Sequence, residues 1–164
     1  MSATLSTHLP TTKEIRDLFE GLLGRDVTLV PTSPLAPSAG SPRTVAIYVD
    51  DHFGLRAVIG CDLEFSARAG AALALVPAPT ANAVIETKGL DDALAENLYE
   101  VLNVAASMFN APGAVHVRLL ELHPAGRAIP PQVESRLLTL GRREDLEVTI
   151  AGYGQGRLSV ILCG

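Results

Sequence analysis

Residues 90–110 read LDDALAENLYEVLNVAASMFN, an apolar stretch that carries one polar stripe. At about 100° per residue, the polar positions fall within an arc of roughly 80° on one side of a helix. The rest of the stretch is almost entirely apolar, so we expect a helix between Leu90 and Phe109. The stripe has acids, amides and a hydroxyl but no cation, and it consists of Asp92, Glu96, Glu100, Asn103, Ser107 and Asn110.

The stripe has two interpretations. A charged stripe on an amphipathic helix is ordinarily its solvated face. A solvated face usually carries lysine and arginine as well, and Asn103 sits mid-helix, where asparagine is a poor helix former. Glu100 and Asn103, three positions apart, point the same way. A carboxylate beside an amide on a rigid helix can pair with a cation and hold a water molecule, although this pattern alone names no reaction.

The bulk composition indicates a globular protein with an aliphatic core. The chain has 164 residues, 48% of them hydrophobic but only 4% aromatic, and its mean hydropathy is +0.27. This length fits one domain with a sizeable core. We therefore assign residues 1–164 to a single domain, with residues 1–10 expected to be flexible and residues 31–43 expected to form a proline-rich loop.

Charge and cysteine content narrow the class of partner. The net charge is −5 and the pI about 5.3, which argues against nucleic acid or an anionic membrane and favours a basic partner. Cys61 and Cys163 form neither a disulfide framework nor a metal motif, as expected for a reduced, cytoplasmic setting. Residues 1–10 do not read as a signal peptide, and the most apolar run, residues 69–76, is too short to span a bilayer.

Periodicity and turn residues predict the remaining elements. A helix starting at Thr11 or Thr12 is expected to end at Leu23, before Gly24. Residues 78–89 read as a linker. Further helices are expected at 64–76 and 132–140, and strands at 27–30, 44–49, 55–61, 114–122, 147–150 and 157–162.

The two predicted hairpins resemble each other. Residues 44–61, TVAIYVDDHFGLRAVIGC, and residues 146–163, LEVTIAGYGQGRLSVILC, share a strand–turn–strand layout and both end on cysteine. A helix precedes each at some distance, so the chain reads as two helix-plus-three-strand units. The first helix has Leu23 where the striped helix has Asn103, so only the second unit offers a carboxylate–amide pair.

These residues resemble the CheX branch of the CheC/CheX/FliY chemotaxis phosphatase family. The helix part of the family motif matches Glu96-x-x-x-Glu100-x-x-Asn103, with Glu96 where the family usually has aspartate or serine. The family's proline is expected at position 126, which is Gly126 here, and Pro124 lies two residues earlier. The resemblance extends from Thr12 to Cys163.

The resemblance implies an α+β fold of two intertwined α-β-β-β units, with a largely antiparallel sheet and long helices packed on it. It also implies hydrolysis of the aspartyl phosphate of a CheY-like response regulator. Glu100 would bind a lysine of the regulator and Asn103 would orient the attacking water, with Glu96, Ser107 and Asp92 contacting the partner. The protein would need no cofactor of its own, because the Mg²⁺ belongs to the regulator, and it could form a homodimer.

Elementary chemistry agrees with these roles. An acyl phosphate is already reactive, so a catalyst mainly has to place water in line. An amide both donates and accepts hydrogen bonds, and it adds no negative charge beside the phosphate. The alternatives that stay open are a non-catalytic adaptor of the same fold and a small-ligand or assembly role.

Other candidate sites have simpler explanations. His116 and His123 are expected to face opposite sides of a regular strand, which disfavours a metal site. His52 lies beside Asp50 and Asp51 in a predicted turn, where turn chemistry explains these residues. The glycine-rich run 152–156 precedes no helix, which disfavours phosphate binding. Ser107 has no nearby histidine, so we do not expect a nucleophile there.

Overall fold

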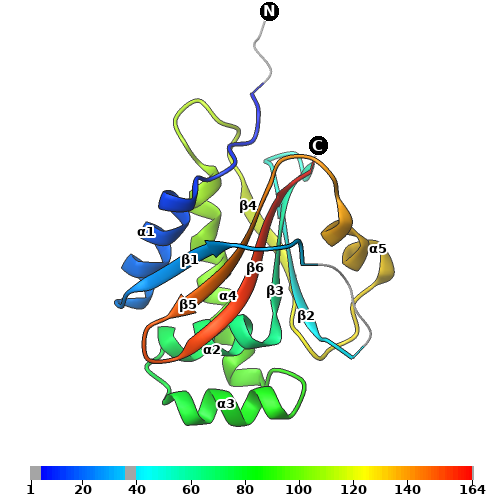
Figure 1. Cartoon of the computed structure of the whole chain (residues 1–164). Coiled ribbons are helices and arrows are strands. Elements are labelled where there is room, and N and C mark those ends of the chain that lie inside the picture. The colour runs from blue at the N-terminus through cyan, green and yellow to red at the C-terminus, as the bar shows by residue number, and fades with distance from the viewer. Residues whose placement is uncertain (1–4, 36–39, 164) are drawn as a thin grey trace, which may run out of the picture.

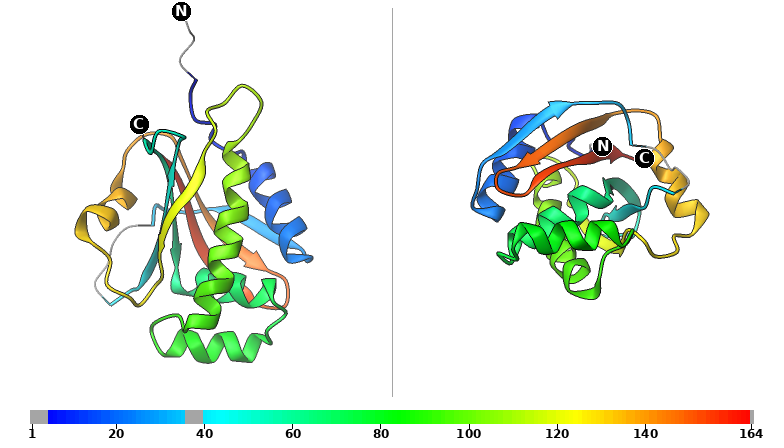
Figure 2. Two further views of the ribbon diagram at one scale, coloured as in Figure 1. Left: turned by 180° about the vertical axis from the view of Figure 1, so that it is seen from behind. Right: turned by 60° about the horizontal axis from the view of Figure 1, so that its bottom comes forward.

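A computed structural model describes residues 5–35 and 40–163. Its centre is a six-stranded antiparallel sheet with the strand order β1-β5-β6-β3-β2-β4. Helices α1, α2 and α4 lie on one face of the sheet, α3 packs against α2, and a short helical segment lies against the other face (Figures 1 and 2). The strands are β1 (Val27–Pro31), β2 (Arg43–Val49), β3 (Leu55–Asp62), β4 (Arg118–His123), β5 (Arg143–Ile150) and β6 (Gly154–Leu162).

The helices follow the predicted order with one addition. They are α1 (Thr12–Leu23), α2 (Leu63–Leu73), α3 (Ala78–Glu86), α4 (Asp92–Ala105), the 3-10 helix η1 (Ala106–Phe109), α5 (Pro131–Glu134) and the 3-10 helix η2 (Ser135–Leu138). Residues 1–4, part of the expected flexible terminus, and residues 36–39, part of the proline-rich loop, lie outside the described residues. Next to that gap, Leu35 is buried in the structure.

The first helix forms where its sequence signals place it. Thr11 caps α1 by accepting a hydrogen bond from the Glu14 N–H, and the Glu14 side chain accepts one from the Thr11 N–H. This capping box satisfies backbone donors that the first turn leaves unpaired. Gly24 ends the helix with a φ of 67°, in the left-handed region.

The sheet confirms two interleaved α-β-β-β units. Exchanging β1 with β4, β2 with β5 and β3 with β6 gives the same strand order, read from the opposite edge of the sheet. The central β3–β6 register obeys the same exchange, because Ile59 pairs with Val160 while Val58 pairs with Ile161. Strands of one unit therefore lie between strands of the other, and the interleaving ties the units into one sheet.

The two hairpins do not match in every strand. Aligned on their final cysteines, Thr44 corresponds to Leu146, and Thr44 pairs with Cys61. Leu146 pairs instead with Leu158, five positions before Cys163. The second turn is shorter, since β5 ends at Ile150 and β6 already begins at Gly154. Because turn length sets hairpin register, the pattern match holds for β3 and β6 but not for β2 and β5.

Several predicted segments need correction. The strand predicted at 157–162 begins at Gly154, and the helix predicted at 64–76 ends at Leu73. The expected linker 78–89 contains helix α3, because Pro79 lies in the first turn, where proline is tolerated. The strand expected at 114–122 is only Arg118–His123, because Asn110 holds Val117 at the end of a loop. The helix expected at 132–140 is the short pair α5 and η2, and the strand expected at 147–150 already begins at Arg143.

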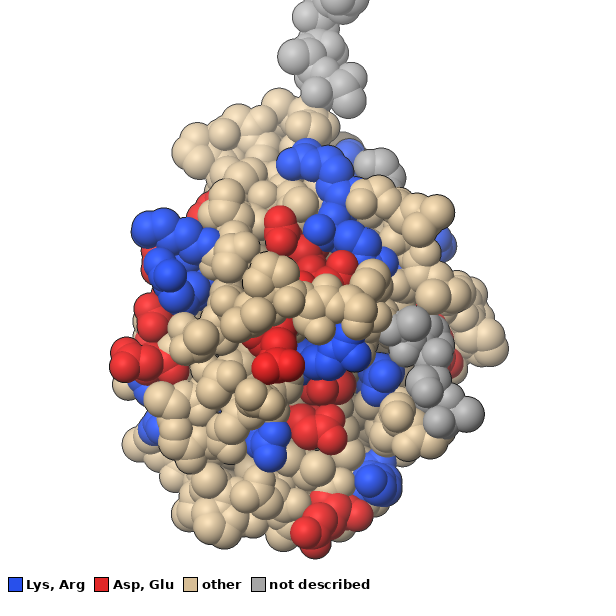
Figure 3. All heavy atoms as spheres, in the orientation of Figure 1, with Lys and Arg blue, Asp and Glu red and all other residues tan. Residues whose placement is uncertain are grey.

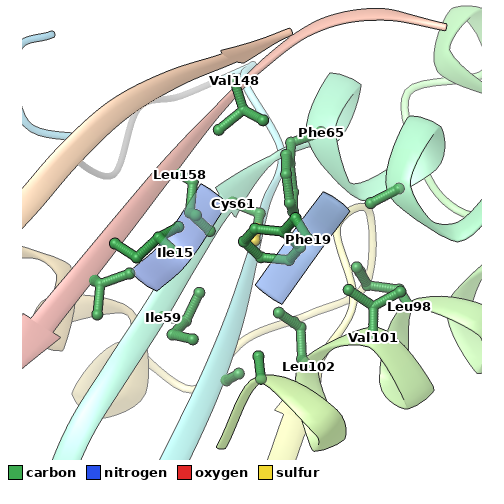
Figure 4. Close-up of a cluster of buried hydrophobic side chains, with 14 of the residues drawn as sticks. Ile15, Phe19, Ile59, Cys61, Phe65, Leu98, Val101, Leu102, Val148 and Leu158 are labelled. Carbon is green, nitrogen blue, oxygen red and sulfur yellow. The ribbon is translucent and has the colours of Figure 1, made fainter. Parts of the chain in front are cut away.

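The main core lies between the sheet and helices α1, α2 and α4. Figure 4 shows Phe19 of α1 and Phe65 of α2 meeting above the β3 and β6 side chains, with ring centroids 5.6 Å apart at an interplanar angle of 76°. Leu98 and Leu102 of α4 close the cluster from the other side. A smaller cluster on the opposite face centres on Leu137 of η2. Within the described residues, no helix is both long and apolar enough to cross a membrane.

We expect Gly156→Ala to lower the free energy of unfolding by about 2–3 kcal/mol. A Cβ at this position would lie 2.4 Å from the backbone N and Cα of Phe65, so α2 would have to move off β6. Denaturant unfolding followed by circular dichroism measures the change.

Gly21→Ala is the matched control, since a Cβ there meets nothing within 4 Å on the exposed side of α1. Alanine should raise stability by about 0.5–1 kcal/mol at a mid-helix position. Equal stability of the two variants would contradict the close approach of α2 to β6.

Candidate functional site

Helix α4 presents the polar stripe to solvent. Asp91 caps its first turn by accepting a hydrogen bond from the Leu94 N–H at 2.9 Å. The apolar side faces the core through Leu94, Leu98, Val101, Leu102 and Ala105. All six stripe residues are exposed. The face of the molecule turned away from α4 has basic and acidic side chains interspersed (Figure 3), unlike the cation-free stripe.

Glu100 and Asn103 lie one turn apart on the exposed side of α4. Within the described residues, neither side chain makes a hydrogen bond or an ion pair. Glu96 and Ser107 are exposed on the same side, one turn before Glu100 and one turn after Asn103. The carboxylate and the amide therefore stay available to another molecule.

The backbone beside Asn103 is held from the sheet. The Ala106 N–H donates to the Asn103 and Val104 carbonyls, as α4 tightens into η1. The Leu102 carbonyl accepts a hydrogen bond from the Tyr48 hydroxyl at 2.5 Å. Burial raises the pKa of Tyr48 well above its usual value, so the hydroxyl stays protonated and donates. Tyr48 thereby fixes the turn of helix that carries Asn103.

Two stripe residues have partners within the protein. Asp92 accepts a hydrogen bond from the Arg127 guanidinium at 2.6 Å. The Asn110 amide bonds both backbone groups of Val117, accepting from the N–H at 2.8 Å and donating to the carbonyl at 3.1 Å. Asn110 therefore braces the loop that leads into β4, and it is not free for an external ligand.

A shallow hollow of about 320 Å³ lies beside the first half of the stripe. It is lined by Asp92, Ala95, Glu96, Tyr99, Leu122, Pro124 and Arg127. Pro124 thus reaches the helix from two residues before the position where the family has its proline. Gly126 has a φ of 94°, which proline cannot adopt.

Sequence reasoning missed the apolar border of the stripe. Tyr99 and Val104 are 42% and 40% exposed and flank it on α4. The helical spacing of Tyr99 and Val104 on either side of the stripe is the sequence signal that could have found this border.

The other candidate sites have structural roles. Asp50 organises the β2–β3 turn by accepting hydrogen bonds from the N–H groups of His52 and Gly54 and from the Arg56 guanidinium. The Arg56 bond, followed by those of Gly54 and His52, lowers the pKa of Asp50 to about 2. Burial raises the pKa of the Cys61 and Cys163 thiols. Across residues 5–35 and 40–163, no group of three histidine, cysteine or acidic side chains could hold a metal ion.

Comparison with known proteins identifies the fold. No family model and no curated protein matches this chain. Among solved structures, a chain of the FliM–SpeE complex from H. pylori is 9% identical with a TM-score of 0.59, covering 92% of this chain and 80% of that one. A chain of the FliG–FliM complex from H. pylori is 11% identical with a TM-score of 0.56, covering 92% and 91%.

FliY from Thermotoga maritima is 16% identical with a TM-score of 0.51, and the match covers 95% of this chain and 93% of FliY. At these identities the likeness concerns the fold, and it agrees with the interleaved units described above. The chain therefore has the fold of the CheC/CheX/FliY chemotaxis proteins, a fold that it shares with FliM.

Proposed function

We propose that this protein is a phosphatase that removes the aspartyl phosphate of a CheY-like response regulator. The observation that carries the proposal is the exposed pair Glu100 and Asn103, which have no hydrogen-bonding partner among the described residues and lie on a helix packed rigidly against the sheet. The spacing of the pair matches the family motif, and FliY has the same fold.

Hydrolysis of an aspartyl phosphate would require two side chains of this protein, Asn103 and Glu100. Asn103 would enter the regulator's site and orient a water for in-line attack on phosphorus, since its amide both donates and accepts. Glu100 would pair with a lysine of the regulator and so fix the position of Asn103. The regulator's own Mg²⁺ offsets charge on the phosphoryl group. Glu96, Ser107 and Asp92 would contact the regulator around this pair.

The first unit supports a single site on α4. In α1, the Glu20 side chain accepts a hydrogen bond from the Val27 N–H at 3.1 Å. Leu23, where a second amide would be needed, is buried. The carboxylate of α1 is thus engaged within the fold, and no amide accompanies it.

We expect Asn103→Ala to leave the fold intact and to slow dephosphorylation at least about 100-fold, because the attacking water loses its orienting group. The measurement is the decay of a response regulator phosphorylated with acetyl phosphate, with wild type and with the variant. Gln132→Ala, exposed in α5 on the opposite face of the sheet from α4, is the control and should retain the activity. A fully active Asn103→Ala variant would remove Asn103 from the mechanism.

Glu100→Lys should weaken binding to the phosphorylated regulator at least about tenfold, because a cation would face the regulator's lysine. Isothermal titration with the regulator held in its beryllofluoride-activated state measures the affinity. Unchanged affinity would mean that the stripe is only a solvated face.

Tyr48→Phe should cost about 1–3 kcal/mol of stability, because the Leu102 carbonyl loses its buried donor. Well below the melting temperature, the variant should bind the regulator normally but dephosphorylate it more slowly. Normal binding together with slower dephosphorylation would show that Tyr48 positions Asn103, because a general loss of folded protein would reduce both. Equal losses in binding and rate would show that Tyr48 acts through stability alone.

A binding module is the second candidate. FliM from H. pylori forms complexes with SpeE and with FliG in solved structures, and the exposed apolar side chains Tyr99 and Val104 beside the stripe suit a protein partner. If the decay assay finds no acceleration across several regulators, retained binding that is lost on Tyr99→Ala would favour this candidate.

A further inference from the structure

A second hollow lies where the loops before α4 and after β4 meet the start of β2. Its volume is about 410 Å³. We call it the cationic hollow, and it is lined by Gly40, Ser41, Pro42, Arg43, Lys88, Gly126, Arg127, Ile129 and Glu134. Neither Glu100 nor Asn103 lines it, so it is separate from the proposed catalytic pair.

Basic side chains outnumber acidic ones in the lining of the cationic hollow. Arg43, Lys88 and Arg127 line it with one carboxylate, Glu134, and Glu64 lines a narrower recess that also includes Arg43 and Lys88. Arg127 is paired with Asp92, which lies outside the lining. Within the described residues, neither Arg43 nor Lys88 makes an ion pair.

Arg43 is oriented by backbone carbonyls. Its guanidinium donates to the carbonyls of Ser41 and Pro42, at 3.1 and 3.4 Å. The side chain is half-buried, and its Nε has no acceptor among the described residues. The carboxylate of its cross-strand neighbour Asp62 attracts it from a distance longer than an ion pair. An anion entering the hollow would give the guanidinium a charged partner in direct contact.

The walls of the hollow are built by a close crossing of two loops. A Cβ on Gly126 would lie 2.4 Å from the Cα of Gly89, so only glycine allows this approach. The Leu90 N–H bonds the Ala125 carbonyl at 3.0 Å beside the crossing. Lys88 itself has a φ of 67°, a strained value for lysine. The backbone therefore holds Lys88 and Arg127 at the hollow before any ligand arrives.

We infer that the cationic hollow binds the phosphate group of a small molecule. Two arginines and a lysine are the side chains that phosphate oxygens pair with most strongly. The volume is that of an ordinary small-ligand site and can accommodate a mononucleotide. Pro42 and Ile129 add apolar wall on which the rest of such a ligand could pack.

Arg127 connects this hollow to the stripe. It lines both the cationic hollow and the hollow beside Glu96 and Tyr99, and it pairs with Asp92 at the start of α4. A phosphate in the cationic hollow would compete with Asp92 for the same guanidinium. Ligand binding and the Asp92–Arg127 pair are therefore opposed, whatever reaction the stripe performs.

The test is a titration of the full chain with sodium phosphate, sodium pyrophosphate and adenosine monophosphate, each against sodium chloride at matched ionic strength. Amide chemical shifts of Lys88, Gly89, Gly126 and Arg127 report binding. We expect saturable shifts at these positions. Saturation by pyrophosphate but not by the nucleotide assigns a free phosphate or diphosphate as ligand, and tighter nucleotide binding assigns a nucleotide.

Four variants make the inference specific. Arg43→Gln and Lys88→Gln should each weaken binding about tenfold by removing a charge-assisted hydrogen bond. Asp92→Asn should tighten binding severalfold by freeing Arg127. Arg142→Gln is the control and should change affinity less than about twofold, because Arg142 lines a separate hollow with Arg56 at the other end of β3. Shifts that chloride reproduces, or equal weakening by Arg142→Gln, would overturn the inference.

Discussion

The hydrogen bond from the Tyr48 hydroxyl to the Leu102 carbonyl joins the sheet to helix α4 next to the exposed Asn103. Its donor lies on β2, the strand next to the edge strand β4, and its acceptor is the residue immediately before Asn103 in α4. Where α4 tightens into η1, the Ala106 N–H donates to the Asn103 and Val104 carbonyls, and the Leu102 carbonyl accepts the Tyr48 hydroxyl. The buried, neutral Tyr48 side chain thus fixes the position of the helix turn that carries the exposed Asn103 amide.

The helices of the two interleaved units expose different side chains. Both units contribute three strands to an order that is unchanged when the units are exchanged. In α1, the carboxylate of Glu20 accepts a hydrogen bond from the loop to β1, and Leu23 packs in the core. Glu100 and Asn103 of α4 are exposed to solvent instead. Corresponding positions are therefore engaged within the fold in one unit and exposed in the other.

The loops around α4 place basic side chains next to the acidic first turn of this helix. Gly89 and Gly126 cross closely enough to bring Lys88 and Arg127 to the start of β2. The same Arg127 reaches back to Asp92 at the first turn of α4. Pro124, rather than residue 126, lies against the helix. This loop lies between the cationic hollow and the hollow beside Glu96.

The sequence by itself determined the elements whose signals are local. Helical spacing of apolar residues predicted α1 and the exposed face of α4, including Glu100 and Asn103, and turn residues predicted both hairpins. Tertiary structure decided what depends on distant segments. The register of β5 follows turn length, and helix α3 forms behind prolines that read locally as breaks. Arg43, Lys88 and Arg127 line one hollow only because three loops come together in the fold. The periodicity of a sequence describes one segment at a time, so it cannot predict which distant segments will be neighbours.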